Sequence, residues 1–136
     1  MAAGGHPLVM TAERFSAWID RYENAWRTAG TEPLRDLFTA EATYLPAPFD
    51  EPLRGLGPIA TFWEAEREGP DEAFTMSYEM VAVDGATGVA RLEVRYGEPA
   101  RRTYRDLWII ELDEAGRCRA FEEWPFYPDQ PRAATP

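Results

Sequence analysis

The second half of this chain is a series of alternating segments joined by short turns, and this pattern constrains the fold more than any other feature. Polar and apolar side chains alternate over residues 74–84, 89–96, 102–113 and 117–124. A period of two is typical of β-strands, and short loops between successive strands favour antiparallel pairing. The sequence therefore predicts an antiparallel meander.

The first half is predicted to be mostly helical. A first helix begins after the N-cap residue Thr11, ends at Gly30, and buries a stripe of large side chains at helical spacing: Phe15, Trp18, Ile19, Tyr22 and Trp26. A short helix at 33–38, a short strand at 42–45 and a third helix from about residue 57 follow. The charged end of this third helix, which includes Arg67, is interpreted as a solvated face. Helices gathered before an antiparallel sheet indicate an α+β domain whose helices cover one face of the sheet.

One domain is predicted over residues 11–127, with a flexible lead-in at 1–10 and an irregular tail at 128–136. The 136 residues are enough to bury about two-thirds of the unfolded surface in one core. No apolar run approaches the roughly 20 residues of a membrane span, and residues 1–5 lack the basic region of a signal peptide. We therefore expect a cytoplasmic protein.

Composition narrows the chemistry. A net charge of −10 argues against nucleic acid and anionic membranes as partners. Cys118 is the single cysteine and His6 the single histidine, so a Ser-His-Asp triad and a Cys- or His-based metal site are not expected. No Gly-rich phosphate loop occurs either. We expect no metal and no cofactor, and any chemistry falls to carboxylates and phenols.

The strand at 102–113 carries a carboxylate among apolar residues. Asp106, Trp108 and Ile110 share one of its faces, and Leu107 and Ile109 share the other. Apolar residues on both faces indicate that both are covered, and because the helices cover one, a second subunit is expected on the other. This predicts a homodimer.

Asp106 is expected to point inward beside Trp108. Burial there would raise its pKa and suit it to act as a general acid or base. The alternative is a structural ion pair, for which Arg91 on the neighbouring strand is the candidate partner.

Two further strands carry candidate charges. On the last strand Phe121 and Glu123 share one face, so either Glu123 or its neighbour Glu122 faces inward or into an interface. Arg91 and Glu93 lie on the more polar face of the strand at 89–96, and periodicity turns them toward solvent.

Several segments together resemble the SnoaL-like, nuclear transport factor 2-like superfamily. They are RYENAW at 21–26, LFTAEATY at 37–44, PFDEP at 48–52 with Gly55, Ile59 and Trp63 after it, and GRCRAFEEW at 116–124. The resemblance implies a cone-shaped, cystatin-like roll, in which a strongly curved antiparallel sheet wraps a long helix around one apolar pocket. The superfamily includes polyketide cyclases, ketosteroid isomerases, limonene epoxide hydrolases, dehydratases and plain binding or dimerisation modules.

Two of these groups allow roles to be compared. Tyr22 matches the oxyanion-donating tyrosine of ketosteroid isomerases, but their aspartate base falls on Pro46 here and their protonated aspartate near Trp108, so steroid isomerisation is not expected. The similarity to limonene epoxide hydrolases assigns a charged trio and a tyrosine to Arg91, Glu93, Glu123 and Tyr44. Their water-orienting asparagine again falls on Pro46. This similarity would turn Arg91 and Glu93 inward, against the periodicity.

The leading expectation is a cofactor-free enzyme that acts by acid–base chemistry on a small apolar carbonyl or epoxide compound. Asp106 or Glu123 would move the proton while Tyr22 and Tyr44 hold an oxygen, and Arg91 and Glu93 are further catalytic candidates. Residues 46–53 are expected to form the rim of the pocket. Aromatic side chains would line the pocket and this rim: Trp26, Phe49, Trp63, Trp108 and Phe121. The alternative is a non-catalytic ligand-binding or dimerisation module with a pocket filled by aromatic side chains.

Overall fold

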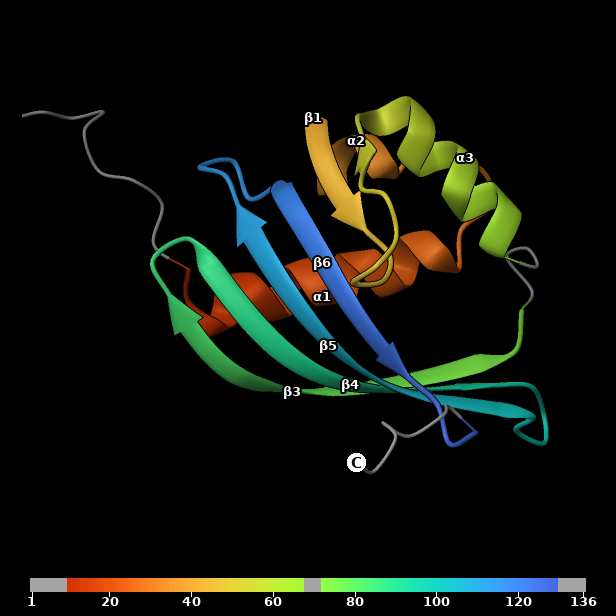
Figure 1. Ribbon diagram of the computed structural model, residues 1–136. Coiled ribbons are helices and arrows are strands. Elements are labelled where there is room, and N and C mark those ends of the chain that lie inside the picture. The colour runs from red at the N-terminus through yellow and green to blue at the C-terminus, as the bar shows by residue number, and fades with distance from the viewer. Residues whose placement is uncertain (1–9, 68–71, 130–136) are drawn as a thin grey trace, which may run out of the picture.

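A computed structural model describes residues 10–67 and 72–129, which form one curved sheet wrapped around a long helix (Figure 1). The helices are α1 (Ala12–Trp26), α2 (Leu34–Leu37) and α3 (Leu56–Glu66). The strands are β1 (Phe38–Leu45), β2 (Leu53–Arg54), β3 (Phe74–Asp84), β4 (Thr87–Tyr96), β5 (Arg102–Leu112) and β6 (Cys118–Phe126). The predicted α+β class and cone-shaped architecture are confirmed.

The sheet has the strand order β2-β1-β6-β5-β4-β3. Strands β3 to β6 form the predicted antiparallel meander. Strand β1 is longer than the predicted 42–45 and pairs with β6 in parallel, because it lies beside the last strand rather than beside its neighbour in sequence. Strand β2 was not predicted, since two residues are too few to show periodicity.

Helix α1 supplies the centre of the core. The Thr11 side chain accepts a hydrogen bond from the backbone N–H of Arg14 at 3.1 Å, as an N-cap residue should. The helix ends at Trp26, before the predicted Gly30, and buries the predicted aromatic stripe. Trp18 Nε1 donates to the Leu37 carbonyl at 3.0 Å, which fixes α2 against α1.

The start of α1 packs closely on β4. A Cβ added at Gly88 would lie 2.5 Å from the Phe15 ring, so glycine at this position allows the helix to approach the strand. Met10, at the end of the predicted lead-in, is buried, and its N–H donates to the Gly85 carbonyl. The rest of the lead-in, with His6, and residues 130–136 of the tail lie outside the described residues.

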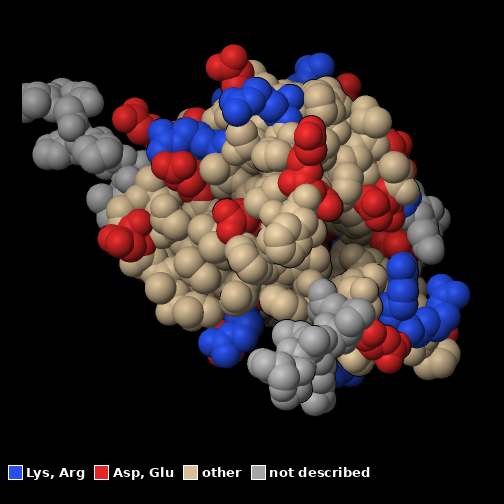
Figure 2. All heavy atoms as spheres, viewed as in Figure 1, with Lys and Arg blue, Asp and Glu red and all other residues tan. Residues whose placement is uncertain are grey.

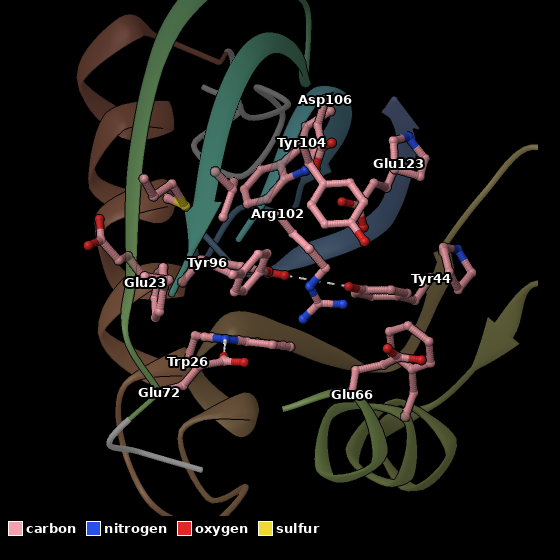
Figure 3. Close-up of a pocket in the computed structure, with 18 residues that line it drawn as sticks. Glu23, Trp26, Tyr44, Glu66, Glu72, Tyr96, Arg102, Tyr104, Asp106 and Glu123 are labelled. Atoms are coloured by element: carbon pink, nitrogen blue, oxygen red, sulfur yellow. Dashed lines mark hydrogen bonds between the residues drawn. The ribbon is translucent and has the colours of Figure 1, made fainter. Parts of the chain in front are cut away.

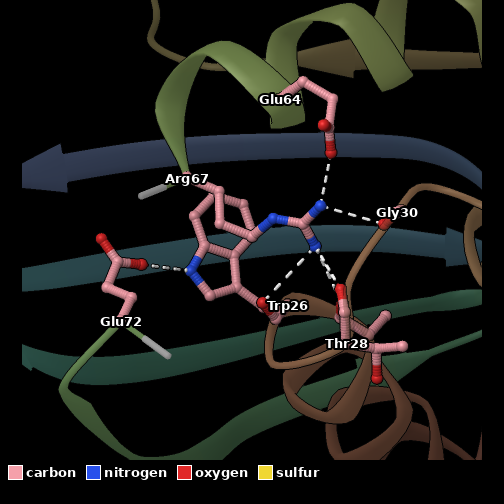
Figure 4. Close-up of polar contacts among 7 residues, drawn as sticks. Trp26, Thr28, Gly30, Glu64, Arg67 and Glu72 are labelled. Carbon is pink, nitrogen blue, oxygen red and sulfur yellow. Dashed lines mark hydrogen bonds and ion pairs between the residues drawn. The ribbon is translucent and has the colours of Figure 1, made fainter. Parts of the chain in front are cut away.

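Arg67, just after α3, fastens the end of α1. Its guanidinium donates to the carbonyls of Ala25 at 3.2 Å, Thr28 at 2.8 Å and Gly30 at 2.9 Å, and forms an ion pair with Glu64 (Figure 4). The Ala25 carbonyl also accepts from the N–H of Thr28 at 3.1 Å, and the carbonyls of Thr28 and Gly30 lie beyond the last turn of the helix. A buried cation there adds a donor and balances the negative end of the helix dipole. The interpretation of Arg67 as part of a solvated face is wrong, because its side chain is 3% exposed.

The surface carries both charges. On the face seen in Figure 2, acidic and basic groups are interspersed around largely neutral surface. The outer face of the sheet combines ion pairs, such as Arg91 with Glu79 at 3.3 Å, with the partly exposed apolar side chains of Leu107 and Trp124. No helix of the described residues is long and apolar enough to cross a membrane.

Candidate active site

A cavity of about 230 Å³ lies between the inner face of the sheet and helices α1 and α3. Much of its wall is aromatic, and Figure 3 shows these rings facing a common space. Arg102 is the one basic residue among the described residues of the lining. Five acidic residues line the cavity as well: Glu23, Glu66, Glu72, Asp106 and Glu123. An aromatic cavity with a few convergent polar groups is typical of a small-molecule site.

Two of these acids, Asp106 and Glu123, come together because of the register between β5 and β6. Trp108 pairs with Glu123, and Asp106 pairs with Pro125, so the two acids are diagonal neighbours on the inner face. Asp106 is 5% exposed, and within the described structure its Oδ1 has no hydrogen-bond partner. Asp106 is therefore shielded from bulk water, and the half-buried Glu123 lines the same cavity.

Their surroundings favour one shared proton. Burial raises the pKa of Asp106, while hydrogen-bonding interactions with Glu123 and Trp108 oppose the rise. Burial also raises the pKa of Glu123 well above its usual range, and the hydrogen bond and charge of Asp106 raise it further. Two adjacent buried carboxyl groups titrate as one system, in which the first proton is held tightly. The pair therefore holds one proton between its two carboxyl groups at pH values where a solvent-exposed carboxyl would be ionised.

Two phenols face this pair. The hydroxyl groups of Tyr22 on α1 and Tyr44 on β1 lie 3.5 Å apart. Burial raises the pKa of both far above neutrality, and the charge of Glu123 adds to the effect. Both therefore remain neutral hydrogen-bond donors, the form required to hold a carbonyl or developing oxyanion.

The rim of the cavity carries one hydrogen-bonded pair, Trp26 with Glu72, and one cation, Arg102. Trp26 Nε1 donates to Glu72 Oε1 at 2.9 Å. The guanidinium carbon of Arg102 lies over the Tyr96 ring, 5.3 Å from its centroid, and Figure 3 shows this side chain reaching into the cavity. The rim thus already brings a cation against an aromatic wall.

The structure brings together four of the residues predicted to be catalytic: Asp106, Glu123, Tyr22 and Tyr44. Of the predicted wall residues, Trp26 and Trp108 line the cavity. The predicted partner of Asp106, Arg91, is not its neighbour in the structure. Arg91 lies on the other face of the sheet, and the neighbouring side chain is the acid Glu123.

Arg91 and Glu93 do not reach the cavity, so their inward placement is wrong. Arg91 is 60% exposed and pairs with Glu79, while Glu93 pairs with Arg105 at 3.6 Å. Side chains alternate along a strand, and the apolar residues Leu92 and Val94 point to the inner face of the sheet. Arg91 and Glu93 therefore point to the outer face. Periodicity placed this strand correctly where the family resemblance did not.

Three predicted wall residues lie elsewhere. Phe49 is fully exposed at a turn closed by a hydrogen bond from Asp50 N–H to the Ala47 carbonyl, so the expected dip into the pocket is wrong. Trp63 and Phe121 are buried in the core, where Trp63 meets Tyr22 edge-on and Phe121 stacks on Tyr22 and Tyr44. Both therefore pack against the tyrosine rings of the cavity wall on the side of the core.

Sequence reasoning missed part of the lining. Tyr104 has the parity of Asp106 and Trp108, and Tyr96 ends the apolar face of β4, so strand parity could have found both. Glu66, Glu72 and Arg102 lie at element ends, where periodicity gives no direction. Among the described residues, no group of three or more His, Cys, Asp or Glu side chains is arranged to hold a metal ion.

Comparison with solved structures supports the fold. A protein from Kribbella flavida DSM 17836, provisionally named a ketosteroid isomerase, superposes with a TM-score of 0.64 at 14% identity, over 91% of this chain and 84% of that one. An LEH-like epoxide hydrolase from M. tuberculosis gives 0.64 at 16% identity, over 84% of each chain. A DUF3225-family protein of unknown function from Pectobacterium atrosepticum SCRI1043 gives 0.60 at 21% identity, over 85% of this chain and 93% of that one.

Sequence comparison identifies the family. Among curated proteins, none matches the sequence significantly. Residues 19–121 match the SnoaL-like domain, which is most of the chain and includes the second half of α1, all of β1 and the greater part of the cavity wall, and which ends two residues before Glu123. The protein therefore belongs to the SnoaL-like domain family.

Proposed function

We propose that this protein is a cofactor-independent acid–base enzyme that acts on a small carbonyl or epoxide compound. The observation that carries the proposal is the pair Asp106 and Glu123, two carboxyl groups side by side in a desolvated cavity with their pKa values raised. Such a pair offers an acid and a base in the same place near neutral pH. Tyr22 and Tyr44 add neutral donors opposite it.

For an epoxide, ionised Asp106 would take a proton from a water molecule as the water oxygen bonds to an epoxide carbon. The carbon–oxygen bond then breaks, and the departing oxygen takes the proton of Glu123. For a carbonyl compound, Asp106 would take the proton from the α-carbon while Glu123 protonates the oxygen and a tyrosine hydrogen-bonds to it. Asp106 would then return its proton to a different carbon of the enol as the enol O–H proton goes back to Glu123, which gives the isomerised product and restores the pair. In the epoxide case the proton gained by Asp106 passes to Glu123, which has given up its own, and this also restores the starting state.

The test is conversion of a panel of small cyclic epoxides, unsaturated ketones and dicarbonyl compounds, followed by chromatography. We expect turnover of at least one class, with a rate that falls on both sides of an optimum, because one carboxyl must be ionised and the other protonated. A double variant, Asp106→Asn with Glu123→Gln, is the blank. Binding of panel compounds with no conversion above this blank would contradict the proposal and favour the non-catalytic binding module.

We also propose that the protein is a homodimer assembled through the outer face of the sheet. Leu107 is 37% and Trp124 38% exposed there, and an interface that covers them should bury more than about 1,000 Å² in total. Light scattering is expected to give twice the 15.4 kDa chain mass, and Leu107→Glu is expected to shift it toward one chain. Ala65→Glu on the exposed surface of α3 adds the same charge away from the sheet and should change nothing. A mass of one chain for the wild type would contradict the dimer.

A cytosolic location completes the proposal. Its support is that the one cysteine, Cys118, is buried as a free thiol, which suits a reducing compartment.

A further inference from the structure

We propose that the ligand of this cavity is a small organic cation, an amine whose ammonium group lies at the glutamate- and aromatic-lined rim while its oxygen-bearing end reaches Asp106 and Glu123. The inference rests on the proposed function for the role of the inner end of the cavity. The choice of an amine rests on charge and on the aromatic wall.

Negative charge in the cavity exceeds what its own side chains balance. Glu23 is paired with Arg27 at 2.8 Å, and Glu72 accepts from Trp26. The exposed side chain of Glu66, at the cavity rim, forms no hydrogen bond or ion pair with another described residue, and its charge adds to the rise in the pKa of Glu123. Even with one proton shared by the inner pair, Arg102 alone leaves an excess of carboxylates, and their field is stronger beside a low-dielectric wall.

The same rim presents aromatic faces. Trp26 and Tyr22 have nearly parallel rings, with 6° between their planes, and Tyr96 lines the same cavity. Electron-rich faces of Trp and Tyr attract cations within about 6 Å. Arg102 already takes this position over Tyr96, so this wall accepts a positive group in the structure itself.

The inner end has hydrogen-bonding capacity that the protein leaves unused. Asp106 Oδ1 and Trp108 Nε1 are both buried, and although Asp106, Trp108 and Glu123 are close enough to affect the carboxyl pKa values, neither atom makes a hydrogen bond of normal distance and angle to a described residue. A buried polar atom without a partner lowers stability, and a hydrogen bond to a bound molecule removes that cost. The carboxyl oxygen of Asp106 can accept a hydrogen bond and the indole N–H of Trp108 can donate one. Together they suit a ligand end that carries a hydroxyl group, or one that carries an epoxide or carbonyl oxygen next to a water molecule.

Figure 3 shows how the two ends lie relative to each other. Glu66 and Glu72 are on one side of the cavity, Asp106 and Glu123 are across it, and Arg102 reaches between them. A ligand that spans this distance would place its charge and its reactive end in separate positions. The charge would then fix which end of the molecule meets the proton-transferring pair.

Three probes of equal size separate the possibilities: phenethylamine, phenethyl alcohol and phenylacetate, which are cationic, neutral and anionic near pH 7. Binding can be followed through the fluorescence of the tryptophan residues in the wall. We expect the amine to bind at least about tenfold more tightly than the alcohol, and phenylacetate to bind most weakly.

Three variants make the test specific. Glu66→Gln should weaken amine binding about three- to tenfold and leave the alcohol unchanged, since it removes a charge and keeps the shape. Arg102→Gln should strengthen amine binding, because it removes a competing cation. Glu79→Gln is the matched control: it removes one negative charge on the outer face of the sheet and should have no effect.

Equal binding of amine and alcohol would overturn the inference, as would failure of all three probes to bind. Tightest binding of phenylacetate, lost in Arg102→Gln, would overturn it in favour of an anionic ligand. The outcome is separable from the proposed function. Turnover without amine preference overturns only the choice of ligand, whereas amine preference without turnover overturns only the enzyme.

Discussion

Replacing Glu123 by glutamine is expected to lower the turnover number by at least about a hundredfold, the usual contribution of a positioned general acid. Glutamine keeps the shape of the side chain and its hydrogen-bonding reach but has no proton to give. Asp106→Asn should cost about as much, and the double variant little more, because the two groups act as one unit. The measurement is the steady-state rate on whichever panel compound the wild type converts.

The control is the adjacent residue on the same strand. Glu122 points to the other face of β6, where it accepts from Trp124 Nε1 at 2.5 Å, so Glu122→Gln makes the same chemical change outside the cavity. It should leave turnover unchanged. An equal loss in both variants would mean that the strand, and not the proton, had been damaged.

The same variant should also change how stability depends on pH. The folded pKa of Glu123 is raised above its unfolded value, so the favourable effect of its protonated form is complete below the unfolded pKa and is lost as pH rises through the folded pKa. Glutamine cannot ionise. Glu123→Gln should therefore match the wild type near pH 4 and become more stable than it by about 0.5–2 kcal/mol as the wild-type group ionises.

Thermal melts between about pH 4 and 9 test this expectation. A Glu123→Gln variant that is less stable than the wild type at high pH would show that the carboxylate is compensated by a cation. In that case Glu123 would be a structural ion-pair member, and the proton-sharing pair would not exist.

The largest expected loss of stability comes from Arg67→Met, at about 2–5 kcal/mol, because it removes several hydrogen bonds from a charged donor, which contribute about 1.5–3 kcal/mol each and are not fully additive. The substitution preserves much of the apolar stem but removes the guanidinium donor from the carbonyls of Ala25, Thr28 and Gly30, of which Ala25 keeps the N–H of Thr28. These groups end α1, so the helix that carries Tyr22 and Trp26 should loosen at its C-terminus. Urea denaturation gives the free energy of unfolding directly.

Two companion variants identify the cause. Glu64→Gln should cost less than about 1 kcal/mol, since Glu64 is 57% exposed and contributes little as a surface ion. Arg119→Met removes an arginine from an exposed ion pair with Glu111 and should be equally mild. If Arg67→Met lost no more than Arg119→Met, the contacts seen in Figure 4 would not hold the helix in solution.

The sequence predicted the faces of the strands but not the neighbours across them. Alternation placed Asp106 and Trp108 inward and Leu107 outward, because parity is a property of a single strand. The meeting of Asp106 with Glu123 depends on the register of β5 against β6, which includes an irregularity near Leu112 that one strand's pattern does not encode. Arg67 was missed for a similar reason: the carbonyls it binds come from a helix end about forty residues earlier in the chain.

The strand order has a consequence for when the site can exist. Strand β6 is the last to be made, yet it lies between β1 and β5. Until it inserts, β1 has only the short β2 beside it, and the cavity lacks Glu123. Assembly must therefore close a loop between the two ends of the domain, an entropic cost that slows the folding of proteins rich in contacts distant in sequence. A ribosome-bound chain in which β6 is not yet made would carry Asp106 without Glu123 beside it, so the pair cannot form before β6 is synthesised and inserted.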